Sequence, residues 1–84
     1  MTEVVVYTKD GCHLCERVIS ALKTLASEQP FDMATMDITT SAELFERYQY
    51  VIPVVEIDGK VRLGGAALSN PITLEDVLRK ALSV

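Results

Sequence analysis

Hydrophobic and polar positions in the first part of the chain predict a strand, a helix and a second strand. Residues 3–8 are a β-branched and aromatic run of near-continuous apolar character, which is typical of a strand covered on both faces. From Cys12 onward apolar residues recur at helical spacing, and Pro30 marks the end because the residue before a proline is disfavoured in helical geometry. Residues 31–38 follow as a strand with weaker alternation. The apolar positions of the predicted helix are Cys15, Val18, Ile19, Leu22, Leu25 and Ala26.

Capping signals predict two further helices. Thr40 and Glu43 have the spacing of a capping box, in which each side chain accepts the free backbone N–H of the other residue. Thr73 is followed by Asp76 at the same spacing and predicts the start of a last, amphipathic helix. The apolar residues are Leu44, Phe45 and Tyr48 in the shorter helix, and Leu74, Val77, Leu78, Ala81 and Leu82 in the last one.

Asp58 and Gly59 predict a hairpin between two short strands, 54–57 and 60–63, because both residues of such a turn must tolerate a positive φ. The order of elements is therefore strand, helix, strand, helix, strand, strand, helix. Alternating strands and helices favour parallel pairing at the front of the sheet, and the hairpin favours antiparallel pairing at its back. We expect an α/β fold with a four-stranded mixed sheet flanked by three helices.

The composition suits one ordinary globular domain. The chain has 84 residues, of which 49% are hydrophobic and 24% are charged, and we expect residues 1–84 to form a single domain. A formal net charge of -4 and the lack of clustered Lys and Arg exclude a phosphate-binding surface, so no nucleic acid partner is expected. No apolar run reaches the roughly 20 residues of a membrane span, and the N-terminus lacks a basic flank. A soluble, cytoplasmic protein without a membrane partner is therefore expected.

Two cysteines, Cys12 and Cys15, stand at the junction of the first strand and the first helix. In a reducing compartment such a pair is more often catalytic or metal-binding than a structural crosslink. Unpaired backbone N–H groups and the positive end of the helix macrodipole stabilise a thiolate at a helix start, which predicts Cys12 as the nucleophile. Cys15 lies one turn further along, on the face of Val18 and Leu22. It is therefore predicted to be less exposed and to resolve the mixed disulfide.

Two plainer interpretations of the cysteine pair are less favoured. Structural zinc requires four ligands, and only Cys12, His13 and Cys15 are at hand, so no metal is expected. Cysteine also packs as a small buried apolar residue, although a pair at a strand-to-helix junction favours redox chemistry. The role of His13 is open between two alternatives: it would lower the pKa of Cys12 when protonated, or it would be solvated and idle.

Three segments of the chain together resemble the glutaredoxins and the small glutaredoxin-like proteins. The resemblance spans nearly the whole chain. It implies the thioredoxin fold, with a central four-stranded sheet and three helices, and this agrees with the order of elements above. It also implies a redox-active disulfide and an oxidoreductase role in electron transport and cell redox homeostasis. The segments are Tyr7-Thr8-Lys9-Asp10-Gly11-Cys12-His13-Leu14-Cys15, then Val51-Ile52-Pro53-Val54-Val55, then Gly64-Gly65.

The resemblance implies roles for residues outside the cysteine pair. Pro53 matches a cis-proline that opens a strand beside the redox pair, and Ile52 before it would offer free backbone to a bound thiol substrate. Lys9 matches a basic residue that contacts a glutathione carboxylate, and Gly65 belongs to the implied glutathione-binding set. The plainer interpretations are a trans-proline tolerated at a strand start, a solvated lysine and a glycine that only ends the hairpin. The departures from the family pattern are Leu14, in place of an aromatic residue, and Ala66, Ala67 and Leu68, in place of polar or acidic ones.

The sequence thus predicts a thiol-disulfide oxidoreductase that acts on protein or glutathione mixed disulfides by dithiol exchange. No tightly bound cofactor is expected, glutathione is the implied co-substrate, and the chain is expected to be a monomer. One alternative is a non-enzymatic redox-sensing or delivery module that docks through apolar surface around Leu14, Val51 and Ile52. A second alternative is a glutathione-dependent iron-sulfur carrier, in which two chains hold one cluster through Cys12.

Overall fold

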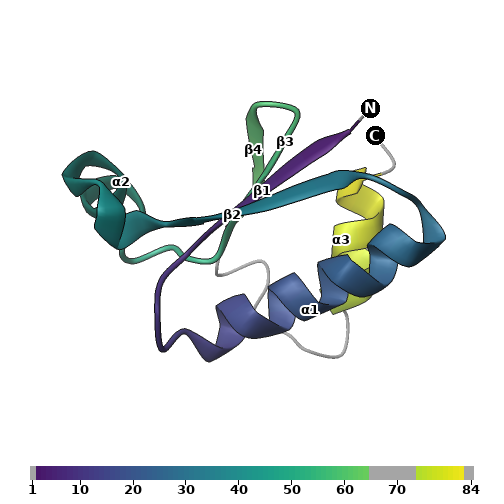
Figure 1. Cartoon of the computed structure of the whole chain (residues 1–84), viewed down its shortest axis with the longest axis horizontal. Coiled ribbons are helices and arrows are strands. Elements are labelled where there is room, and N and C mark those ends of the chain that lie inside the picture. The colour runs from purple at the N-terminus through teal and green to yellow at the C-terminus, as the bar shows by residue number, and fades with distance from the viewer. Residues whose placement is uncertain (1, 65–73, 83–84) are drawn as a thin grey trace.

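The helices and strands follow the order that the sequence predicts (Figure 1). The structure is a computed structural model that describes residues 2–64 and 74–82. The predicted cap of the last helix, Thr73, lies outside these residues. The elements are β1 (Glu3–Thr8), α1 (His13–Glu28), β2 (Asp32–Asp37), the 3-10 helix η1 (Ile38–Thr40), α2 (Ala42–Tyr48), β3 (Val54–Ile57), β4 (Lys60–Leu63) and α3 (Leu74–Leu82).

The strands form one mixed sheet in the order β2-β1-β3-β4. As expected, β1 pairs in parallel with β2, whereas β1 with β3 and β3 with β4 pair antiparallel. Side chains of a strand alternate between the two faces of a sheet. Val4 and Val6 are accordingly buried, whereas Val5 and Tyr7 on the opposite face are half-buried. The apolar run of β1 is therefore fully covered on one face only, in contrast to the prediction of cover on both.

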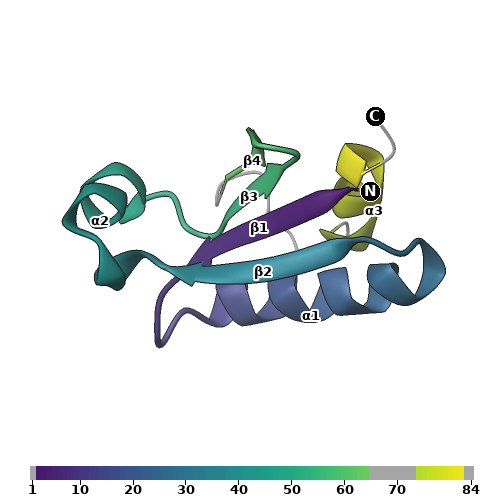
Figure 2. The same cartoon turned by 45° about the horizontal axis from the view of Figure 1, so that its top comes forward.

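The covered face of the sheet packs against α1 and α3, and Figure 2 shows α1 running beneath the strands. α1 ends at Glu28, close to Pro30 as predicted, with Gln29 in extended geometry. Complete burial of one large aliphatic side chain contributes roughly 1.5–3 kcal/mol, so this core is the main source of stability. The buried core residues are Val4, Val6, Val18, Ala21, Leu22, Leu25, Val55, Ile57, Leu74, Leu78 and Leu82.

The predicted hairpin turn is confirmed, and it is also attached to the start of β1. Asp58 and Gly59 have φ values of 50° and 83°, the positive values that a tight hairpin turn requires. The N–H of Asp58 donates to the carbonyl of Glu3 at 2.9 Å. Its carboxylate oxygen accepts the N–H of Glu3, also at 2.9 Å. The turn therefore holds both backbone groups of the first residue of β1.

The start of α2 differs from the predicted capping box. Ser41 is the N-cap, and its hydroxyl accepts the N–H of Leu44 at 3.4 Å. Thr40 is instead the last residue of η1, and its hydroxyl donates to the carbonyl of Asp37 at 2.7 Å. The Asp37 carboxylate accepts from both the N–H and the hydroxyl of Thr39. The turn after β2 thus engages the Thr40 hydroxyl that the capping-box prediction assigned to α2, while the Glu43 carboxylate pairs with Arg47.

α2 has no fully buried residue and lies beyond one end of the sheet. Its attachment to the sheet includes Tyr48, whose ring centroid is 4.9 Å from that of Tyr7. Figures 1 and 2 both place the loop from β1 to α1 beyond this same end of the sheet. No helix in the described part of the chain has the length and apolar character needed to cross a membrane.

Candidate redox site

The cysteine pair is placed by a tight turn between β1 and α1. The N–H of Cys12 donates to the carbonyl of Lys9 at 3.4 Å, and Gly11 within the turn has a φ of 81°. This conformation is strained for any residue with a Cβ, which explains the glycine. Cys12 is the N-cap of α1 in extended geometry, and its carbonyl accepts the N–H of Glu16 at 3.1 Å. The first sulfur therefore stands at the positive end of the helix.

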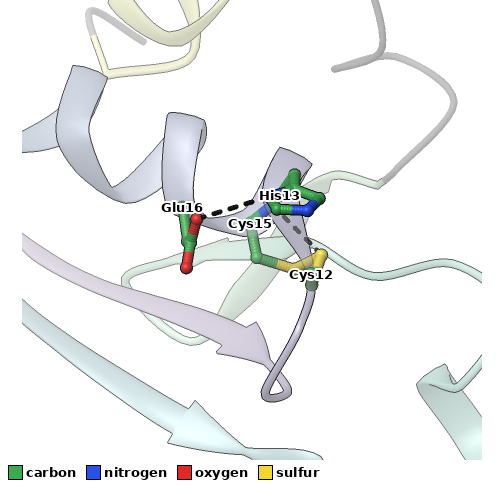
Figure 3. The surroundings of a disulfide bond; sticks show 4 residues. All are labelled: Cys12, His13, Cys15 and Glu16. Atoms are coloured by element: carbon green, nitrogen blue, oxygen red, sulfur yellow. Dashed lines mark hydrogen bonds and ion pairs between the residues drawn. A yellow bond between two sulfur atoms is a disulfide. The ribbon is translucent and has the colours of Figure 1, made fainter.

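Cys12 and Cys15 form a disulfide (Figure 3), with their Cα atoms 5.2 Å apart. Cys15 has no exposed surface, whereas Cys12 is half-buried. The difference in exposure confirms the sequence-based expectation that Cys15 is the less accessible partner. The backbone N–H of Cys15 also donates to Sγ of Cys12 at 3.1 Å. Cys12 is thus partly exposed and its sulfur accepts a hydrogen bond, whereas Cys15 is enclosed in the protein.

His13 faces Glu16 in this structure (Figure 3). Its Nδ1 lies 3.7 Å from Oε2 of Glu16, and the two side chains are 92% and 74% exposed. A pair this exposed contributes little to stability. The sequence-based prediction for His13 did not include Glu16 as its partner. The spacing of three residues on a helix was the available signal for Glu16.

The bond between Ile52 and Pro53 is cis, as the resemblance implies, and Pro53 is fully buried. Tyr7 pairs with Val54 in the sheet. Pro53, which precedes Val54, therefore lies beside the last residue of β1, near the loop to Cys12. The expectation of free backbone at Ile52 is wrong for its N–H. That group donates to the carbonyl of Tyr48 at 3.1 Å, an acceptor it shares with the N–H of Val51.

The residues expected to contact glutathione are only partly described. Lys9 is exposed, and none of the described residues gives its side chain a hydrogen bond or ion pair. Gly65 and the segment Ala66–Leu68 lie outside the described residues. Leu14 is half-buried on the first turn of α1. Within residues 2–64 and 74–82, no group of three or more His, Cys, Asp or Glu side chains is arranged to hold a metal ion.

These features define a thioredoxin-fold protein with a redox-type thiol function: a cysteine pair at a helix start, a cis-proline alongside, and the β2-β1-β3-β4 sheet. Comparison with protein families narrows this class. Residues 3–83 match the family described as Glutaredoxin-like domain (DUF836), and the chain belongs to this family.

The chain is also similar in sequence to two mycobacterial proteins and in fold to two solved structures. Protein Rv0508 of Mycobacterium tuberculosis and protein Mb0520 of Mycobacterium bovis are each 36% identical to this chain over an alignment of 63 positions that covers 69% of it. The match spans 65% of the length of these relatives. The solution structure of protein Ne2328 from Nitrosomonas europaea has a TM-score of 0.68 and 29% identity, covering 75% of this chain and 76% of that one. A mutant thioredoxin from Halobacterium salinarum, 19% identical, shares the fold with a TM-score of 0.62 over 95% of this chain and 74% of its own.

Proposed function

We propose that this protein is a thiol-disulfide oxidoreductase that reduces mixed disulfides of proteins or of glutathione. The observation that carries the proposal is the asymmetry of the cysteine pair. Cys12 is reachable from solvent and accepts the Cys15 N–H at 3.1 Å, while Cys15 is fully enclosed. Such an arrangement divides the work between an attacking thiol and a resolving thiol.

The proposed cycle begins with the pair reduced. The Cys12 thiolate attacks one sulfur of the substrate disulfide, a new S–S bond forms to Cys12, and the other substrate sulfur leaves as a thiolate. The Cys15 thiol then loses its proton and attacks the Cys12 sulfur. The second substrate thiolate is released, and the Cys12–Cys15 disulfide of this structure is formed. The substrate gains two electrons, the protein loses them, and a dithiol or glutathione would restore the pair.

Local electrostatics support Cys12 as the attacking group. The N–H of Cys15 and the positive end of the α1 macrodipole both favour an anion at Sγ, which would lower the pKa of the Cys12 thiol. The carboxylate of Glu16 in the first turn acts in the opposite direction. Nδ1 of His13 lies 3.7 Å from that carboxylate.

The test compares Cys12→Ser with Cys15→Ser as matched variants in the reduction of a small disulfide and of a glutathionylated peptide. Cys12→Ser is expected to abolish both activities. Cys15→Ser is expected to form the first mixed disulfide and to stop there, which mass spectrometry detects as a stable adduct. Activity that survives Cys12→Ser would refute the proposal. So would a thiolate absorbance of Cys12 that titrates at the ordinary cysteine pKa of about 8.5.

A further inference from the structure

Exposed apolar side chains gather at the end of the sheet that carries the redox pair. Met36 pairs in register with Tyr7 close to the end of β1, and Phe45 lies on α2. Tyr50 and Val51 belong to the connection between α2 and the cis-proline. Their exposed fractions are 42% for Met36, 38% for Phe45, 90% for Tyr50 and 45% for Val51. Among the described residues, a fifth exposed large apolar side chain, Val61 on β4, lies elsewhere in the sheet.

The charges around these side chains are mostly negative. Residues 36–51, which run from the end of β2 through α2, contain the acidic residues Asp37, Glu43 and Glu46 and one basic residue, Arg47. The guanidinium of Arg47 lies 3.1 Å from the carboxylate of Glu43 and is partly neutralised by it. Hydrogen bonds from the side chain and backbone of Thr39 hold the pKa of Asp37 below its usual range, so this carboxylate is charged at neutral pH. The region of α2 therefore presents apolar groups within a net negative field.

We propose that this α2 surface, made of Phe45, Tyr50, Val51, Glu43 and Glu46, docks a protein substrate. The proposal rests on the proposed function, and it names the substrate class. The occupant is a protein segment that carries apolar and basic side chains next to its disulfide cysteine. Apolar groups match the exposed side chains, and cations match the carboxylates.

Two arguments favour this occupant over a small thiol compound. The surface lies at the same end of the sheet as the redox loop, so a segment whose cysteine reaches Cys12 can extend over α2 (Figures 1 and 2). Glutathione carries more carboxylate than ammonium groups, so Glu43 and Glu46 repel it from the α2 surface, whereas the exposed Lys9 of the redox loop attracts its carboxylates. Exposed charges act chiefly on the rate of association, so the preference should depend on salt.

The test uses two synthetic peptides of equal length with one cysteine flanked by leucine and phenylalanine. One has lysine at both ends and the other has glutamate. Each cysteine carries thionitrobenzoate as a mixed disulfide. When reduced Cys12 attacks the peptide sulfur, the coloured thionitrobenzoate thiolate leaves, so its appearance reports the second-order rate constant.

At low salt the rate constant for the lysine peptide is expected to be at least about threefold higher than that for the glutamate peptide. The ratio of the two rate constants should fall toward unity at high salt. The double variant Glu43→Gln and Glu46→Gln should remove most of this preference. Glu28→Gln is the matched control, because Glu28 is also ion-paired, with Arg79 at 3.3 Å, at the far end of α1 from Cys12. This control should leave the ratio unchanged.

The apolar part of the surface is tested with Tyr50→Ser. The Tyr50 side chain is 90% exposed, so its replacement should leave the fold intact. Its rate constant with the lysine peptide should fall several-fold, while the rate with bis(2-hydroxyethyl) disulfide stays constant. Val61→Ser, at 54% exposure on β4, is the control and should change neither rate. Equal rates for the two peptides, or equal effects of the variants and their controls, would overturn the docking surface. If the protein without substitutions does not reduce bis(2-hydroxyethyl) disulfide, the proposed function itself is refuted.

Discussion

The ring of Tyr7 in β1 lies 4.9 Å from the ring of Tyr48 at the end of α2, with an angle of 35° between the ring planes. The Tyr7 hydroxyl also donates to the carboxylate of Glu56 in β3 at 3.1 Å. The guanidinium of Arg47 lies 6.0 Å from the centroid of the Tyr48 ring. Because α2 has no fully buried residue, this cluster is central to holding the helix against the sheet.

Replacement of Tyr48 by Ala should therefore loosen α2. We expect the free energy of unfolding to fall by about 1–2 kcal/mol, since an aromatic contact and half-buried apolar area are both lost. Urea denaturation measures this change. Tyr50→Ala is the control, because a side chain that is 90% exposed should alter the value by no more than about 0.5 kcal/mol. Equal losses in the two variants would contradict the anchoring role of Tyr48.

The bond from Tyr7 to Glu56 predicts a loss of stability at alkaline pH. Burial, followed by the hydrogen bond to Glu56, raises the pKa of Tyr7 above its usual 10.0. The folded state therefore favours the protonated hydroxyl. Its stabilisation is fully present below the unfolded pKa of 10.0 and is lost as the pH rises through the higher folded value.

Urea denaturation of the protein and of Tyr7→Phe over the alkaline range tests this. The phenylalanine variant should be less stable by about 1 kcal/mol at neutral pH, through loss of one hydrogen bond. The difference between the two proteins should shrink above pH 10.0. A difference that stays constant across this range would argue against titration of Tyr7.

Gly11 and Gly59 offer a comparison of two turns with the same backbone strain. Their φ values are 81° and 83°, and a Cβ at either position would meet no atom within 4 Å. Alanine at either glycine should lower stability by about 1–2 kcal/mol, a purely conformational cost. Gly11→Ala should in addition slow the alkylation of Cys12 several-fold, because it alters the turn that places this sulfur. Gly59→Ala should leave alkylation unchanged, and an equal effect of both would show that general loosening is responsible.

Much of the fold follows from local signals in the sequence. The bounds of β1, β3 and β4 match the predicted runs, because β-branched residues and the Asp58-Gly59 turn indicate these strands. The Cys12–Cys15 pair and the relative burial of its two sulfurs also follow from helical spacing.

The failures lie where tertiary contacts compete with local patterns. Ile52 was expected to have free backbone, yet the last turn of α2 supplies the Tyr48 carbonyl to its N–H. The α2 cap was assigned to Thr40, yet the hydroxyl of that residue bonds back to Asp37. Spacing alone cannot tell which of two neighbouring hydroxyls faces the helix.

The cap assignment can be tested with matched variants. Ser41→Ala removes the acceptor of the Leu44 N–H and should lower the free energy of unfolding by about 1 kcal/mol, with loss of helical circular dichroism signal. Thr40→Ala removes a bond within η1 and should leave the helical signal unchanged. The opposite result would restore the capping box with Thr40.

The carbonyl of Tyr48 accepts hydrogen bonds from two N–H groups, that of Val51 at 2.9 Å and that of Ile52 at 3.1 Å. These bonds fix the turn between α2 and the cis-proline. Because these two hydrogen bonds join the last turn of α2 to the residues before Pro53, a displacement of that turn would also displace the backbone beside the redox loop. The end of α2 and the cis-proline corner therefore behave as one mechanical unit.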